Sequence, residues 1–199
     1  METKTGTKKA PAAKTTASKT TTAKASAKTA AKTPAKKGAA KELKDLFEDS
    51  LKDIYWAEKA LLKALPTMMK NATDAKLKKA IDNHITETEE QIVRLEECFE
   101  ALGKKAQAKK CDAMQGLLDE GKSIIEETEP GTVRDAGIIA AAQKVEHYEI
   151  ATYGTLAAFA KVLKEEDCLK HLLNTLEEEK KCDELLTKVA DTNLNSKAI

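Results

Sequence analysis

The first 41 residues of this 199-residue chain lack Val, Ile, Leu, Phe, Tyr, Trp and Arg. They hold eleven Lys and a single acid, Glu2, and are otherwise almost only Ala, Thr and Ser. Such a segment has too little apolar surface to offset the entropy lost on ordering. We therefore predict a disordered Lys/Ala/Thr-rich tail over residues 1–41, followed by a globular domain over residues 42–199.

Two further absences bear on where the protein works. No apolar run is long enough for a transmembrane helix or for the apolar part of a secretory signal, so we expect a cytoplasmic protein with no membrane partner. The four cysteines, Cys98, Cys111, Cys168 and Cys182, show no CxxC or zinc-finger spacing. Reduced structural thiols are the state this pattern favours.

Runs of β-branched residues with a period of two are also absent, which argues against a sheet. Apolar residues instead recur at i, i+3, i+4 and i+7, the period of a helix with one buried face. A shorter helix is expected over Cys111 to Glu127, and Thr132 with Asp135 resembles a capping box. The four long helices are predicted from Leu43 to near Met69, from Thr73 or Asp74 to Leu102, from Thr132 to about Leu163, and from near Glu166 to Val189.

The order of these segments points to one architecture. Two long helices joined by a short loop, a crossover of about 30 residues, and two more long helices have the connectivity of a ferritin-like bundle. We therefore predict an all-α fold, a ferritin-like four-helix bundle with a short crossover helix, in a single domain over residues 42–199.

Each long helix carries a glutamate where the apolar period points inward: Glu58, Glu87, Glu146 and Glu179. An unpaired carboxylate is costly to bury, so a converging set requires protons or cations. Glu149 follows Glu146 by three residues and Asp183 follows Glu179 by four, which places each pair on one helix face. Oxygen donors at this density suit two iron or manganese ions. The predicted metal ligands are Glu58, Glu87, Glu146, Glu149, Glu179 and Asp183.

Two alternatives stay open at this stage. Glutamates crowd every helix, and some would fall near the edge of the core by chance. His84 shares a face with Glu87 and is either a ligand, directly or through a hydrogen bond to one, or a core histidine satisfied by another partner.

Four strings resemble the YciE/YciF family of ferritin-like bacterial stress proteins: DIYWAEK at 53–59, HITET at 84–88, AAQKVEHYEIATYG at 141–154, and TLEEEK at 175–180. This resemblance implies a bundle with a dimetal centre, often dimeric, and a role in stress responses. The wider superfamily has Glu-x-x-His pairs on helices two and four. Here Glu90 and Cys182 stand at the histidine positions, with Gln91 and Asp183 as the nearer inward substitutes.

The sequence thus predicts a dimetal stress protein that consumes peroxide or oxygen and forms a homodimer. No individual catalytic residue can be assigned from it. The tail carries a charge of +10 and the rest −9, which favours non-specific DNA binding through the tail and a possible place at the nucleoid. A non-catalytic helical scaffold and a nucleoid-associated DNA-binding protein are the alternatives. The candidate DNA-binding residues are Lys8, Lys9, Lys14, Lys19, Lys24, Lys28, Lys32, Lys36 and Lys37.

Overall fold

The computed structural model describes residues 1–2 and 33–199, which belong to two units, Met1–Lys37 and Gly38–Ile199. Most of the predicted tail, including Lys8 to Lys32, lies outside the described residues. Lys36 and Lys37 are described and are exposed. The second unit is helical, and the part of it that the structure describes contains no strand.

The helices of the second unit lie close to the predicted ranges. The short segments α6 (Asn195–Lys197) and the π-helical turn η1 (Ala190–Leu194) follow the last long helix. No described helix is both long enough and apolar enough to cross a membrane. The long helices and the crossover helix are α1 (Leu43–Asn71), α2 (Ala75–Ala101), α3 (Asp112–Glu127), α4 (Thr132–Leu163) and α5 (Glu166–Val189).

The beginning and end of α2 follow from local chemistry. Asp74 is the N-cap, and its side chain accepts hydrogen bonds from the backbone N–H groups of Lys76 and Leu77. The helix ends before Gly103, which has a φ of 67° and donates its N–H to the carbonyl of Glu100. A left-handed glycine after the last turn is the usual end of a helix.

The predicted capping box at the start of α4 is wrong. Gly131 is the N-cap, and the hydroxyl of Thr132 donates to the carbonyl of Lys197 instead. Asp135 is fully buried and accepts hydrogen bonds from the loop between α1 and α2. The competing backbone donors of that loop, distant in sequence, are the reason that the local motif does not form.

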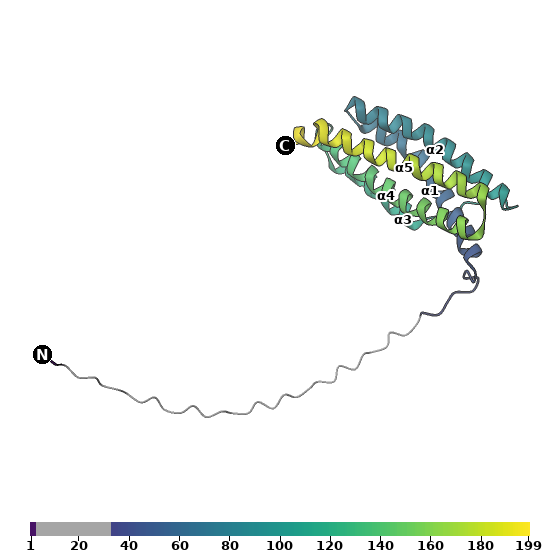
Figure 1. Ribbon diagram of the computed structural model, residues 1–199. Coiled ribbons are helices and arrows are strands. Elements are labelled where there is room, and N and C mark those ends of the chain that lie inside the picture. The colour runs from purple at the N-terminus through teal and green to yellow at the C-terminus, as the bar shows by residue number, and fades with distance from the viewer. Residues whose placement is uncertain (3–32) are drawn as a thin grey trace. The chain divides into compact units, whose positions relative to one another are not determined.

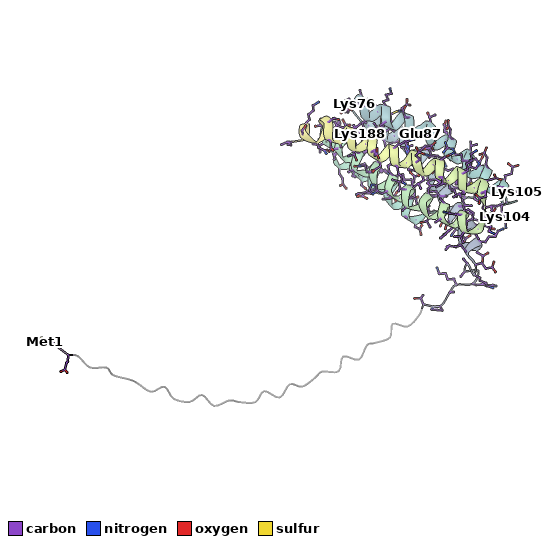
Figure 2. The ribbon with its side chains drawn as sticks, in the orientation of Figure 1. Met1, Lys76, Glu87, Lys104, Lys105 and Lys188 are labelled. Carbon is purple, nitrogen blue, oxygen red and sulfur yellow. The ribbon has the colours of Figure 1, made fainter. Side chains whose placement is uncertain are left out.

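The helices form the predicted ferritin-like bundle (Figure 1). Helix α1 packs against α2 and α4, α5 packs against α2 and α4, and the crossover helix α3 lies against α4 and α1. Lys76 and Lys188 lie at one end of the bundle and Lys104 and Lys105 at the other (Figure 2). The start of α2 and the end of α5 therefore lie at the same end of the bundle, and the two helices pack against each other.

Candidate metal centre

Four carboxylates and one imidazole lie in the interior of the bundle. Glu58 comes from α1, Glu146 and Glu149 from α4, and Glu179 from α5, and none is more than 1% exposed. His84 of α2 is 4% exposed. Each stands within an apolar stripe, as Glu58 does between Ile54 and Leu61, so the packing of the stripe carries the polar group inward.

Most of these side chains are close enough to share an ion. His84, Glu146, Glu149 and Glu179 each offer one ligand atom, and these atoms lie within 4.8 Å of one another. The imidazole Nε2 of His84 lies 3.5 Å from Glu146 Oε1. Glu58 interacts with this group, because burial and then the charge of Glu58 raise the pKa of Glu149. We call these five residues the buried cluster.

Burial and mutual repulsion change the protonation of the buried cluster. Burial raises the pKa of Glu58 to about 7, against hydrogen bonding from Tyr153 and the charge of His84. Burial and the neighbouring carboxylates raise the pKa values of Glu149 and Glu179 well above the ordinary value. For His84 burial lowers the pKa, but Glu146 and other neighbours outweigh it and raise the pKa well above 6.5. The cluster therefore holds protons near neutral pH when no cation is bound.

Two neighbours hold the cluster in place. The hydroxyl of Tyr153 donates to Glu58 Oε1, and the amide of Gln91 donates to Glu179 Oε1. Both residues are buried. Seven other possible ligand atoms of the cluster are buried and make no hydrogen bond, namely Glu58 Oε2, both ring nitrogens of His84, Glu146 Oε2, both oxygens of Glu149 and Glu179 Oε2.

These unpartnered atoms fit a metal centre. A buried polar atom without a partner costs about 1–3 kcal/mol, and native proteins leave few of them. Here seven such atoms gather in one small volume and are all carboxylate oxygens or imidazole nitrogens. Iron and manganese accept this donor set. His84 faces two carboxylates without a hydrogen bond to either, since its Nε2 lies 3.5 Å from Glu146 and its Nδ1 lies 3.7 Å from Glu87.

Glu87 and Asp183 are not brought into the cluster. On α2 the inward positions are taken by His84, Thr88 and Gln91, so the side chain of Glu87 is 43% exposed and its Oε2 lies 3.7 Å from His84 Nδ1. Figure 2 labels Glu87 among the side chains of the α2 and α5 region. Asp183 is 23% exposed, and its Oδ1 accepts from Gln143 at 3.1 Å and lies 3.3 Å from His147. Their assignment as ligands remains a prediction.

Two features of the site were not predicted. The thiol of Cys182 lies with His84 and Glu146 in a second group of possible ligands, and burial raises its pKa to about 12. The sequence feature that could have identified Cys182 is its position three residues after Glu179, where the wider superfamily has a histidine. Arg94 on α2 forms a paired contact with Glu178 on α5, at 2.6 and 2.7 Å. Nothing in the periodicity of α2 identifies that partner.

Comparison with known proteins agrees with this fold. The family model described as a domain of unknown function, DUF892, matches residues 42–199. The chain belongs to this family. Protein YciF of Escherichia coli strain K12 is 46% identical to it over 159 residues, which cover 79% of this chain and 96% of YciF. The resemblance to YciF read from the four sequence strings is thereby confirmed.

Two solved structures at high identity share the bundle. The crystal structure of the Escherichia coli stress protein YciF has a TM-score of 0.75 and covers 78% of this chain and 99% of its own. YcfI of Rhodopseudomonas palustris, described provisionally as a structural protein, is 42% identical with a TM-score of 0.73, over 74% of this chain and 94% of its own.

Proposed function

We propose that the DUF892 domain of this protein binds two iron or manganese ions in the buried cluster and acts in a stress response by consuming peroxide or oxygen. The observation that supports this most is the set of seven unpartnered donor atoms on Glu58, His84, Glu146, Glu149 and Glu179. Bound metal would supply the redox chemistry. The chain would supply the ligands and a site from which bulk water is excluded.

The protein's own groups have definable parts in this site. Tyr153 orients Glu58 through its hydroxyl, and Gln91 orients Glu179 through its amide. Glu146 and Glu149, one turn apart on α4, can reach the same ions from one side. The raised pKa values of Glu149 and Glu179 mean that metal binding must displace protons, so metal affinity rises with pH.

The test is the metal content of protein purified from iron- and manganese-supplemented cells, measured by inductively coupled plasma mass spectrometry. About two metals per chain are expected for the wild type, and Glu58→Ala and Glu146→Ala should lose them while far-UV circular dichroism stays helical. Glu89→Ala is the matched control, since Glu89 is an exposed glutamate on α2. Two metals in both ligand variants would contradict the proposal, and none in the wild type would favour the scaffold alternative.

The same measurement applied to Glu87→Ala and Asp183→Ala decides the ligand set. Loss of metal in either variant would mean that the side chain turns inward when metal binds. Unchanged metal would restrict the ligands to the buried cluster. Peroxide and oxygen consumption by the loaded wild-type protein then tests the reaction.

The charge of the tail supports a second proposal, that residues 1–41 hold the protein on DNA at the nucleoid. Eleven lysines and one acid form a sequence-independent phosphate binder, whereas residues 42–199 carry a charge of −9. Changing Lys8, Lys9, Lys14, Lys19, Lys24, Lys28, Lys32, Lys36 and Lys37 to Gln keeps the length and lowers the charge of residues 1–41 from +10 to +1. A log–log salt slope approaching about −10 in the wild type, lost in this variant, is expected. DNA binding that survives in the variant, or a DNA affinity that does not change with salt concentration, would contradict the proposal.

A cytoplasmic homodimer is part of the proposal as well, on the basis of the family resemblance. Light scattering coupled to size-exclusion chromatography tests the dimer, and a mass of one chain at all concentrations would contradict it.

A further inference from the structure

A groove of about 360 Å³ lies between α1, α3 and α4. Its walls are mainly aliphatic and methionine side chains, among them Leu117, Leu118 and Ile125 of the crossover helix and Ala141 of α4. Asp119, Lys122 and Glu126 of α3 also line it and are exposed, so charged groups stand on its solvent side.

A second, much smaller cavity of about 20 Å³ lies inside the bundle. Its walls come from α1, α2, α4 and α5, and every residue that lines it is buried. Most of these are apolar, such as Leu61, Leu65 and Ile81. The others are His84, Glu146 and Cys182, so this cavity borders the buried cluster.

Met68 and Val145 line both spaces. Met68 comes from the last part of α1, and Val145 directly precedes Glu146 on α4. The two side chains are 7% and 4% exposed, and each contributes to the walls of both spaces. A direct path from the groove to the buried cluster therefore runs past these two side chains.

The lining of this path selects by polarity and by size. Neither side chain at the constriction offers a conventional hydrogen bond, so a polar solute would lose its hydration there at a cost of several kcal/mol. The inner cavity has room for about one small molecule, since one water needs roughly 10–15 Å³. Apolar cavities in proteins stay dry and admit apolar guests such as xenon.

We propose that the groove and the inner cavity form one route by which dioxygen, a small apolar molecule, reaches the buried cluster, with Met68 and Val145 as its constriction. The inference rests on the proposed metal function and deepens it, because it names dioxygen rather than hydrogen peroxide as the molecule that this path admits.

Xenon tests the route without any metal. In metal-free wild-type crystals under xenon pressure, xenon is expected in the groove and in the inner cavity beside His84. Val145→Phe should fill the constriction and remove the inner xenon, whereas Val162→Phe, on the same helix but 70% exposed, should leave it in place. Absence of inner xenon from the wild type, or its persistence in Val145→Phe, would overturn the proposal.

Kinetics then test the choice of molecule. In protein loaded with iron(II), Val145→Phe should slow oxidation by dioxygen about tenfold and leave oxidation by hydrogen peroxide unchanged. Val145→Ala, which widens the same point and is the safer variant for folding, should speed the reaction with dioxygen or leave it as fast. Equal slowing of both oxidants by Val145→Phe would refute selection by polarity, and slowing by Val145→Ala would refute the route.

The two proposals fail in different ways. A protein that binds no metal would remove the proposed function, while xenon would still decide whether the path is open. A protein that binds metal but never xenon in the inner cavity would keep the function and lose the route.

Discussion

The carboxylate of Asp135 on α4 accepts two hydrogen bonds from Thr73, which precedes it by 62 residues in the chain: the backbone N–H at 2.7 Å and the hydroxyl at 2.5 Å. A third comes from the N–H of Asp74 at 2.9 Å. These donors belong to the loop that joins α1 to α2. One buried side chain thereby fastens the first helical hairpin to the start of the second.

Replacing Asp135 by Ala is expected to lower the free energy of unfolding by roughly 2–3 kcal/mol, because the partly buried N–H groups of Thr73 and Asp74 lose their carboxylate acceptor. The matched variant Asp74→Ala removes only a helix N-cap and should cost about 1 kcal/mol. Urea unfolding followed by circular dichroism measures both. Equal costs would mean that the link between the hairpins contributes nothing beyond a local cap.

The same residue marks the limit of what the sequence could predict. Helical periodicity located the four long helices and the crossover helix, because that period is imposed by burial along one face and is read within one segment. Thr132 and Asp135 also match a local capping motif, yet the donors that Asp135 meets come from another part of the chain. Local patterns do not reveal which distant groups compete for a side chain.

The buried cluster shows the same division. The period placed Glu58, Glu146 and Glu179 inward, and the structure finds them there. The period could not decide whether Glu87 or Thr88 points inward, because the two adjacent positions lie at the edge of the buried face of α2. In the structure Thr88 is buried and Glu87 is not. The contact of Arg94 with Glu178 depends on the rotation of α2 against α5, which no single segment specifies.

Two glycines on α4 should respond oppositely to substitution by Ala. A Cβ at Gly137 would lie 2.6 Å from Ile124 Cγ2 of α3, so the Ile124 side chain or the α3 backbone that carries it must shift. We expect a loss of about 1–3 kcal/mol. At Gly154 no atom lies within 4 Å of the new Cβ, and Ala should stabilise the helix by about 0.5–1 kcal/mol. Chemical denaturation of both variants tests this, and a stabilising Gly137→Ala would contradict the close approach of α3 and α4.

The metal-free domain should lose stability as the pH rises from about 5 to about 8. The pKa of Glu58 is about 7 in the fold and 4.5 ordinarily, so between these values the folded state keeps a proton that the unfolded chain has released. Glu149 and Glu179 act in the same direction. The raised pKa of His84 adds to it, since a protonated His84 stabilises the fold below pH 6.5 and that contribution disappears as the pH passes its folded pKa.

Thermal unfolding in the presence of a chelator measures this effect. The midpoint should fall by roughly 5 °C or more between the two pH values. Added iron(II) or manganese(II) should reverse the trend, because bound cations replace the protons. A midpoint that is flat or rises with pH in the chelated protein would mean that the buried carboxyls are not protonated in the fold.

Arg94 should control metal affinity without touching the metal ligands. Its guanidinium holds Glu178 through two hydrogen bonds and also donates to Thr175 at 2.9 Å. Glu178 in turn accepts from Gln91 at 3.2 Å, and the same amide of Gln91 donates to Glu179 in the buried cluster. The guanidinium thus fixes a carboxylate, the carboxylate fixes an amide, and the amide fixes a ligand.

Arg94→Met keeps much of the side-chain length and removes the two hydrogen bonds to Glu178, the first contact in this series. Groups that orient metal ligands typically change affinity by about 10–100-fold, and we expect a loss in that range for Arg94→Met in competition with a chelator. Arg134→Met is the control. Arg134 lies in the first turn of α4, donates to the carbonyl of Thr128 after α3, and has no contact with the cluster. Gln91→Leu should reproduce the loss, and combining it with Arg94→Met should add little, since both act through Glu179. Additive losses in the double variant would mean that Arg94 reaches the metal centre by a different path.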